Sequence, residues 1–327
     1  MRHFLLPFRE CGRGKFGAKL GIAARHWAMA TFDGRIREYP GIAVDNMGGD
    51  AQLLYLLSHV HADHIRGLSG FAGSRIYCSA ATRTLLLGTR VDGKRVWAHL
   101  EGVLTALAED VPHLLPVGTE TVSVTLLPAA HCLGSVMFLI RGSRGTVLHT
   151  GDMRAEAWFC RGIGNTVLST LRDIDTVYLD TTFCSARARH LPTRKDAIAD
   201  LVAHLAITHA DKEKQKCTPV YIATGGTVNY EDIFRALCLH FKQRVHVDSV
   251  KRYAGVLFDD GEPVADYITD NEATWIHACV PPCAAAANAL AIVPTAMWFV
   301  QAGHAAAAGG RSIRVRGDAC IVRLLIF

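Results

Sequence analysis

The stretch that decides the fold is His59-Val60-His61-Ala62-Asp63-His64, which follows the apolar run Leu53–Leu57 after one residue, Ser58. That run has the length and composition of a buried strand. In extended backbone, residues two apart point to the same side, so His59 and His61 are placed to bind one metal ion. Asp63 and His64 follow where the chain turns, and we expect them to face a second ion. The pattern therefore predicts a metal site at a strand end.

Two further strand-like runs end in groups that suit the same site. Val122–Leu127 leads to His131, and Thr146–Thr150 is followed by Gly151-Asp152. His131 offers a third imidazole for the first ion, and Asp152 offers a carboxylate able to bridge both ions. Zinc accepts imidazole nitrogen and carboxylate oxygen alike. Ionisable groups that recur just past strand ends indicate one rim of a layered, sheet-based fold.

The composition limits the classes of protein that this chain belongs to. Of its 327 residues, 50% are hydrophobic and 20% are charged, so it buries a large core in one large domain or two. The longest apolar runs, such as Val136–Ile140, fall far short of the ~20 residues that span a bilayer, so no membrane segment is expected. A net charge of +5 is compatible with a polyanionic substrate. The 10 cysteines are expected to be thiols or metal ligands rather than a disulfide scaffold.

The second half of the chain follows a different pattern. Pro192–His209 and Tyr230–His240 have the apolar spacing of helices. Strand-like segments alternate with them at Pro219–Ala223, Val245–Val247 and Thr274–Ala278. This alternation predicts an inserted domain of βα type that begins near Asp180.

The first 28 residues differ from the rest in charge. They carry Arg2, Arg9, Arg13, Lys15, Lys19 and Arg25 against a single acid, Glu10. An Arg-rich, acid-poor start is typical of an organelle transit peptide. The alternative is upstream sequence that is not part of the protein, with Met29 as the true start.

The metal motifs and their surroundings resemble the metallo-β-lactamase superfamily, and more narrowly the DNA cross-link repair nucleases of its β-CASP branch. The superfamily resemblance rests on the H-x-H-x-D-H string, on Ala130–Ser135 and on Thr150–Arg154. Tyr178–Cys184 and a segment that contains Trp298 narrow it to the repair branch. The similarity runs from Met29 to about Arg316. The other segments that carry it are Met29–Gly34, Arg37–Pro40, Leu126–Phe138, Gly145–Arg154, Ile276–Cys279 and Pro294–Phe299.

The resemblance implies an α/β fold, namely a metallo-β-lactamase αββα sandwich with an inserted β-CASP domain, truncated at its C-terminal end. We expect a basic N-terminal extension over residues 1–28 and the lactamase domain over 29–180. The β-CASP domain is expected over 181–310, and a truncated return towards the lactamase sheet over 311–327.

The resemblance also implies a role for each residue of the candidate site. The first metal would be held by His59, His61 and His131, and the second by Asp63, His64 and Asp152, with Asp152 shared. Asp45 matches an aspartate that lies behind the site and orients the histidine loop. Asp180 matches the acidic residue that opens the β-CASP region near the metals. The implied ions are one or two zinc ions, with Mg²⁺ or Mn²⁺ as an alternative second metal, and the chemistry is metal-assisted phosphodiester hydrolysis.

A second metal-ligand group is expected in the inserted domain. His277-Ala278-Cys279 has a spacing that suits adjacent tetrahedral ligands, with Cys283 four residues on and His246 more distant. Two histidines and two cysteines form a closed structural zinc site, and the resemblance implies one in this region. The segment between Cys279 and Cys283 is shorter than in the family. The alternative is that these cysteines pack as small apolar groups.

The implied function is that of a DNA nuclease, acting as a 5′-3′ exonuclease or as an endonuclease at hairpins and overhangs. It would serve double-strand-break repair by non-homologous end joining, or interstrand cross-link repair, in the nucleus, with DNA and an end-joining kinase or ligase as partners. An organelle is the alternative location if residues 1–28 are a transit peptide. The alternative functions are a β-CASP RNA-processing endonuclease and a non-catalytic scaffold that binds DNA or repair partners.

The sequence departs from the family pattern after Arg316. The family continues through a phenylalanine-histidine segment that supplies a further active-site histidine, and then through strands that return to the lactamase sheet. The last histidine of this chain is His304, in an Ala-rich stretch, and it is no substitute. We therefore expect either a truncated form or a divergent protein with impaired chemistry.

Overall fold

The computed structural model describes residues 32–49, 53–91, 93–162, 173–184, 186–188, 191–209, 218–225, 228–280, 282–286, 289–295, 313–315 and 321–324. The expected basic extension and the segment around Trp298 lie outside these residues. Among the helices that fall within the described ranges, none has the length and apolar character needed to cross a membrane.

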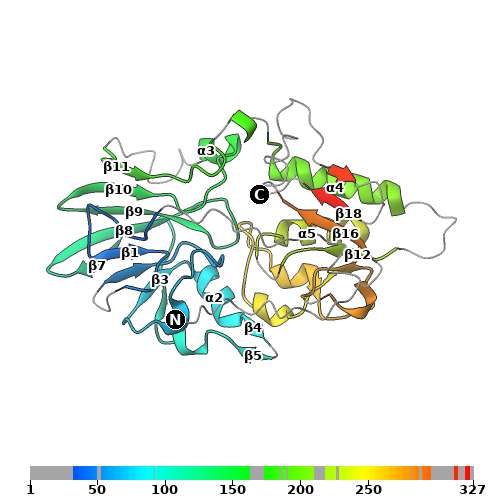
Figure 1. Cartoon of the computed structure of the whole chain (residues 1–327), viewed down its shortest axis with the longest axis horizontal. Helices are drawn as coiled ribbons and strands as arrows, with labels where there is room; N and C mark the ends of the chain where they lie inside the picture. The colour runs from blue at the N-terminus through cyan, green and yellow to red at the C-terminus, as the bar shows by residue number, and fades with distance from the viewer. Residues whose placement is uncertain are drawn as a thin grey trace.

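The first half of the chain forms two sheets (Figure 1). The first contains four parallel strands in the order β1-β2-β3-β6, namely β1 (Ile42–Val44), β2 (Leu54–Leu56), β3 (Ile76–Cys78) and β6 (Leu104–Ala106). The second has the order β11-β10-β9-β8-β7, antiparallel except between β10 and β11. Its strands are β7 (His113–Val117), β8 (Glu120–Pro128), β9 (Val136–Gly142), β10 (Gly145–His149) and β11 (Thr176–Tyr178).

The two sheets pack face to face, and each is covered by a helix on its outer face. Leu56 and Phe138 belong to one buried cluster between the sheets. Because strand side chains alternate between faces, Tyr55 and Leu57 point outward and join a cluster with Leu86 of α2 (Ala80–Gly88). Phe159 of α3 (Ala157–Gly162) packs against the outer face of the second sheet. The resulting layers are those of the expected αββα sandwich, and the mixed α/β fold class is confirmed.

The second half of the chain forms a seven-stranded sheet in the order β14-β13-β15-β12-β16-β18-β17, parallel except between β17 and β18. Its strands are β12 (Val220–Ile222), β13 (Val245–His246), β14 (Ile268–Thr269), β15 (Ile276–His277), β16 (Leu290–Pro294), β17 (Ile313–Val315) and β18 (Ile321–Leu324). Helices α4 (Arg194–His209) and α5 (Glu231–Phe241) pack in the same core, through residues such as Leu205 and Leu237. We call this sheet with α4 and α5 the seven-stranded unit.

The end of the described chain differs from the expected return to the lactamase sheet over 311–327. The strand β18 instead pairs in parallel with β16, in the register Ile292↔Val322, and β17 pairs with β18. Without β18, the backbone of β16 would form an open sheet edge, which attracts a further strand. The segments 313–315 and 321–324 therefore extend the seven-stranded unit.

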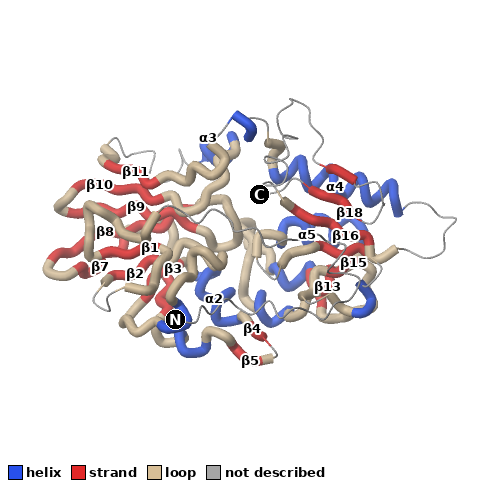
Figure 2. The backbone as a smooth tube through the Cα atoms, viewed as in Figure 1, coloured by secondary structure: helices blue, strands red, loops and turns tan. Residues whose placement is uncertain are grey.

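Short elements connect the sheets (Figure 2). The strands β4 (Arg90–Val91) and β5 (Lys94–Arg95) form a small hairpin. The 3-10 turns are η1 (Leu68–Gly70), η2 (Ala98–Leu100), η5 (Ala186–Ala188), η6 (Val250–Tyr253), η7 (Val264–Tyr267) and η8 (Ala284–Ala286).

Candidate metal centre

The predicted ligands follow strands that end at one rim of the sandwich. In the second sheet, β8 and β10 run in the same direction because both are antiparallel to β9, and β11 is parallel to β10. The rim is joined across the two sheets where the backbone N–H of Val136 donates to the carbonyl oxygen of Ser58, at 3.1 Å. The residues that emerge at this rim are Asp45 after β1, His59–His64 after β2, His131 after β8, Asp152 after β10 and Asp180 after β11.

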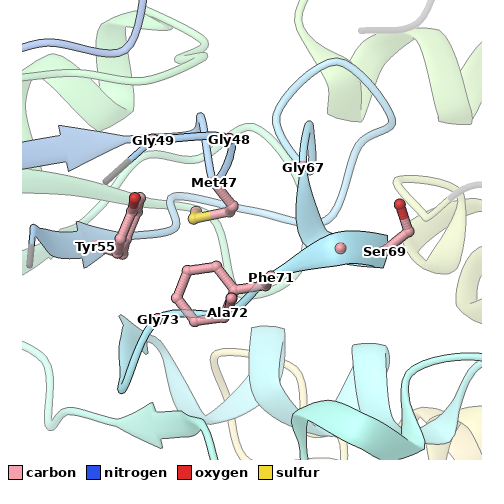
Figure 3. A pocket seen from close by; sticks show the side chains of 10 residues that line it. Met47, Gly48, Gly49, Tyr55, Gly67, Ser69, Phe71, Ala72 and Gly73 are labelled. Carbon is pink, nitrogen blue, oxygen red and sulfur yellow. The ribbon is translucent and has the colours of Figure 1, made fainter. Parts of the chain in front are cut away.

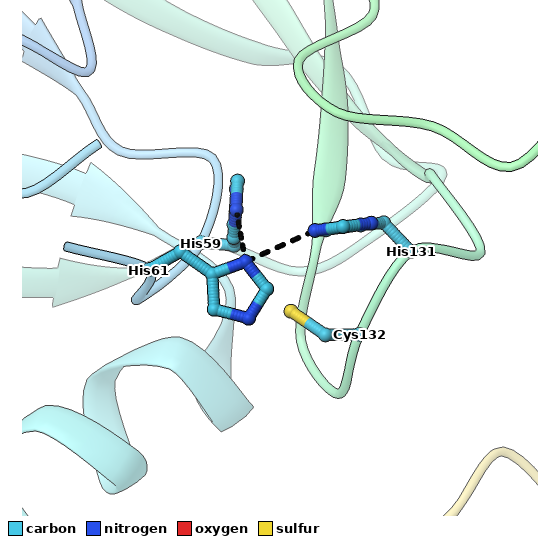
Figure 4. A group of neighbouring side chains, drawn as sticks. All are labelled: His59, His61, His131 and Cys132. Carbon is cyan, nitrogen blue, oxygen red and sulfur yellow. Dashed lines mark hydrogen bonds between the residues drawn. The ribbon is translucent and has the colours of Figure 1, made fainter. Parts of the chain in front are cut away.

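Three imidazoles meet at the centre of the rim (Figure 4). The Nδ1 atom of His61 lies 3.0 Å from Nε2 of His59 and 3.0 Å from Nε2 of His131. Burial lowers the pKa of His61, and it lowers the pKa values of His59 and His131 well below the usual range, with the neighbouring histidines adding to the effect in these two. All three rings are therefore neutral, which is the form that binds a metal.

The hydrogen bonds fix which ring nitrogens carry protons. Ser58 Oγ donates to the Asp45 carboxylate at 2.6 Å, so it accepts from Nδ1 of His59 at 2.9 Å. The Nε2 atom of His59 is then a bare lone pair. At 3.3 Å, Nε2 of His61 donates to the Val228 carbonyl, which leaves Nδ1 of His61 bare. Two lone pairs thus face each other across 3.0 Å.

A metal cation resolves this arrangement. The bare nitrogens of two neutral rings repel each other unless a positive ion lies between them. Two nitrogens bound to one tetrahedral zinc at ~2.0–2.1 Å are about 3.3 Å apart, close to the observed spacing. The donor set of His59, His61 and His131 therefore fits a zinc ion.

A second group shares Asp152 with the first. Its Oδ2 atom faces the three imidazoles, 3.9 Å from Nε2 of His59 and 3.6 Å from Nε2 of His131. Its Oδ1 atom lies 3.2 Å from Nε2 of His64, which is also 3.6 Å from the carboxylate of Asp63. One carboxylate thus presents one oxygen to each group, as a bridging ligand does. The side chain of Asp63 is 62% exposed and lies at the open edge.

Asp45 lies behind both groups and orients them. It is buried, with φ at 55°, a conformation that aspartate tolerates better than most residues. Its carboxylate accepts from Ser58 and lies 2.8 Å from Nδ1 of His64. Burial raises its pKa, but the hydrogen bond and charge of His64 outweigh this and hold the pKa below its usual value.

The environment of His64 requires positive charge beside its ring. Burial lowers the pKa of His64, but hydrogen bonds with Asp152 and Asp45 outweigh burial and raise the pKa to about 11. The carboxylates on its two sides thus stabilise either a proton or a metal cation at Nε2. A metal that binds there must displace the proton.

We expect Asp45→Asn to weaken metal binding by about 10–100-fold, the usual cost of losing a partner that orients a ligand. The amide replaces one acceptor oxygen with an NH₂ group that faces Ser58 or His64 in place of a carboxylate. Zinc affinity measured by chelator competition checks this. Asp33→Asn is the control, because Asp33 is exposed and its carboxylate accepts the backbone N–H of Arg35. Wild-type zinc affinity in folded Asp45→Asn protein would contradict the role given to Asp45.

Local turns place His131 beside the other two imidazoles. Ser135 Oγ accepts the backbone N–H groups of His131 and Cys132, at 3.2 and 3.1 Å. Gly134, with φ at 75°, lies so close to α2 that an added Cβ would be 2.7 Å from the backbone nitrogen of Thr82. This explains the Gly-Ser pair that follows His131 and Cys132.

Residues 56–157 match the family described as the metallo-beta-lactamase superfamily, and they contain all six predicted active-site ligands. This region of the chain belongs to the metallo-β-lactamase superfamily. The matched region begins within β2 and ends at the start of α3, so it covers the rim from which these ligands emerge.

Individual relatives narrow the resemblance. "Protein artemis" from Gallus gallus is 34% identical over 272 residues, which cover 78% of this chain and 36% of that protein. The Homo sapiens protein of that name is 31% identical over 271 residues, covering 78% and 37%. "5' exonuclease Apollo" from Mus musculus is 39% identical over 168 residues, covering 49% and 29%. The chain thus spans well under half the length of these relatives. The expected resemblance to the superfamily and to its DNA cross-link repair nucleases, of which Artemis is one, is confirmed.

Asp180 and Cys132 both lie next to the predicted metal ligands, but their surroundings differ. The carboxylate of Asp180 accepts the N–H groups of Met153 and Thr182, at 3.3 and 2.9 Å, and so supports the loop that carries Asp152. Cys132 Sγ lies within 4.8 Å of the ligand atoms of the three imidazoles. Burial raises the pKa of the Cys132 thiol well above its usual value, so it remains protonated beside them.

A hollow of about 340 Å³ lies elsewhere in this sandwich, beside the loop that follows His64 (Figure 3). Its lining consists largely of glycines together with Met47, Tyr55, Ser69 and Phe71, and it has no carboxylate, imidazole or thiol. Hydrolytic chemistry therefore belongs to the metal centre rather than to this hollow.

The second predicted group comes together within the seven-stranded unit. The ligand atoms of His246, His277, Cys279 and Cys283 all lie within 4.8 Å of one another. Nδ1 of His246 is 3.2 Å from Nδ1 of His277, and Cys283 Sγ is 3.7 and 3.4 Å from these atoms. Neighbouring ligands of a tetrahedral zinc are about 3.3 Å apart for two nitrogens and about 3.6 Å apart for nitrogen and sulfur. The four side chains fit such an ion.

The sequence pattern alone missed several residues that support the centre. Ser58 orients His59, and the Arg194 side chain donates to the carbonyl oxygen of His131. Arg194 lies in a stretch with Lys195, which is typical of a solvated surface, although its side chain is only 17% exposed. Ser58 directly precedes the metal string, which is a usable signal. Arg194 lies 63 residues from His131, and no spacing connects them.

Proposed function

We propose that this protein is a metal-dependent nuclease that hydrolyses phosphodiester bonds in DNA, as a 5′ exonuclease or as an endonuclease at hairpins and overhangs. The observation that carries the proposal is the meeting of three neutral imidazoles with Asp152 and His64 at one rim. The similarity to "5' exonuclease Apollo" and "Protein artemis" supports DNA as the substrate. The seven-stranded unit, beginning near residue 181, would be the β-CASP domain beside the lactamase domain of 29–180.

Each residue at the rim has a defined task in this proposal. His59, His61 and His131 would hold one zinc, and Asp63 and His64 a second zinc, Mg²⁺ or Mn²⁺, with Asp152 shared. Metal ions bound there would activate water and neutralise charge on the phosphate oxygens. Asp45 holds the imidazoles in orientation, and Asp180 holds the loop of Asp152 through the N–H of Met153.

Cleavage assays with and without metal distinguish a nuclease from a protein that only binds DNA. We expect the purified chain with zinc and Mg²⁺ or Mn²⁺ to cleave 5′-phosphorylated single strands, overhangs or hairpins of DNA. Removal of metal by a chelator should stop the cleavage, and returning metal should restore it. RNA of the same sequence is the matched substrate. Faster cleavage of RNA would favour an RNA-processing enzyme, and metal-loaded protein that binds DNA without cutting it would favour a scaffold.

The remaining roles follow from DNA as the substrate. We propose that the protein acts in double-strand-break or interstrand cross-link repair, and therefore in the nucleus. His246, His277, Cys279 and Cys283 would hold a structural zinc, since four ligands leave no position open for substrate.

A further inference from the structure

Two contacts reach from the seven-stranded unit to the three-imidazole group. The carbonyl oxygen of Val228, between β12 and α5, accepts from Nε2 of His61. The side chain of Arg194, at the start of α4, donates to the carbonyl oxygen of His131. We infer that the seven-stranded unit positions two of the three imidazoles, and that Glu231 and Arg194 are the positioning residues. The inference rests on the proposed metal site and names what organises it.

The first contact determines which nitrogen His61 offers. A neutral imidazole has one N–H and one lone pair, and a carbonyl can only accept. With its Nε2 proton directed to Val228, His61 presents the Nδ1 lone pair to His59 and His131. This carbonyl is the acceptor for Nε2 among the described contacts of His61, and it lies 167 residues away along the chain. Loss of its position would free the ring to rotate or to change tautomer.

Glu231 holds the loop that supplies this carbonyl. Its side chain is buried, and Oε2 accepts the backbone N–H of Asn229 at 2.8 Å. Asn229 has φ at 101°, a conformation that is uncommon outside glycine. Such backbone strain persists only where the surroundings enforce it, and it often marks functional sites. Glu231 thus fixes a strained residue directly next to Val228.

Arg194 holds the other loop. Its guanidinium is shared between the carbonyl oxygen of His131 and the carboxylate of Asp232, which is 3.2 Å away. The Arg194 backbone N–H donates to Glu156 at 2.7 Å. Asp232 lies in the first turn of α5, so the contact connects both helices of the unit with the loop after β8.

The other ligands receive their orientation from within the sandwich. Ser58 orients His59, and Asp45 orients His64. The two metal groups therefore depend on different parts of the molecule. Damage to the loop of Val228 should weaken the three-imidazole group and spare the ring geometry of His64.

The experiment measures cobalt(II) and zinc affinity of the full chain carrying Glu231→Ala, Glu231→Gln or Arg194→Gln. Cobalt(II) held by Cys279 and Cys283 has a sulfur-to-metal absorption that the imidazole group lacks, so the two sites are read separately. We expect Glu231→Ala and Arg194→Gln to weaken metal binding at the three-imidazole group by about 10–100-fold. Glu231→Gln retains an acceptor oxygen for Asn229 and should stay within a few fold of wild type.

Two matched variants test whether the effect is specific. Leu237→Ala removes a fully buried, apolar side chain from α5, which makes no hydrogen bond to the loop. Arg235→Gln removes an arginine whose ion pairs are with Asp260 and Glu262. Both should retain metal affinity even where thermal unfolding shows lower stability. Wild-type affinity in Glu231→Ala and Arg194→Gln, or an equal loss in Leu237→Ala or in Glu231→Gln, overturns the inference. No cobalt at the imidazole group of the wild-type protein would instead overturn the proposed function.

Discussion

Asp152→Ala is expected to lower the rate of DNA cleavage by ~10³-fold or more while leaving the fold intact. Charge stabilisation by metal ions contributes several kcal/mol to such reactions, and each 1.4 kcal/mol is about tenfold in rate. Among the described residues, Asp152 is the carboxylate that faces the three-imidazole group through Oδ2 and His64 through Oδ1. Without it, the groups lose their shared ligand.

The measurement compares cleavage of overhang and hairpin DNA by wild-type and variant protein at equal folded concentration. Glu120→Gln is the control for loss of one negative charge, because Glu120 pairs with Arg144 and Ser143 at the start of β8. Circular dichroism and thermal unfolding establish that the Asp152 variant is folded. If it turns over DNA at the wild-type rate, the metal centre as described is not where hydrolysis occurs.

Cys279→Ser is expected to remove about one equivalent of zinc and to lower the melting temperature by roughly 10 °C. Structural zinc contributes about 10–16 kcal/mol of binding free energy in small domains, and this energy stabilises the fold. Burial raises the pKa of the Cys279 thiol to about 11, so a bound cation is needed to stabilise the thiolate. Serine has no comparable affinity for zinc.

Metal analysis and thermal unfolding of the purified variant test this second prediction. Cys160→Ser is the matched control, because Cys160 is an exposed cysteine in α3. The imidazole centre should keep its metal in Cys279→Ser, which separates structural zinc from catalysis. Unchanged zinc content would mean that Cys279 and its neighbours pack as small, mostly buried side chains.

The sequence predicts that the candidate ligands meet at one rim, because their positions follow from local rules. Apolar runs end where His59, His131 and Asp152 begin, and strand ends on one side of a sandwich must meet. The helices α4 and α5 lie within one or two residues of their predicted bounds because their apolar spacing is helical. The pairing of β18 with β16 could not be predicted from the sequence, since it depends on which sheet edge lies open.

The features that the sequence did not reveal all depend on distant contacts. Val228 carries no functional side chain, and its role arises only because its carbonyl lies 3.3 Å from His61. Arginine is a residue type that usually lies at the surface. Arg194 reaches the carbonyl oxygen of His131 only because α4 lies beside the loop of His131. Helix α2 and the strand β3 were not predicted either, because their apolar residues fall in runs too short to distinguish a helix from a strand.

The gathering of the ligands at one rim determines where the chain tolerates changes in length. An inserted or deleted residue within β2, β8 or β10 would turn every later side chain of that strand to the opposite face and move a ligand out of place. The turns at the far ends of β8 to β10, at Gly118 and between Gly142 and Gly145, carry no ligand. Drift in loop length over evolution, and the insertion of tags or reporter peptides in the laboratory, should therefore be tolerated at that end and excluded from the rim.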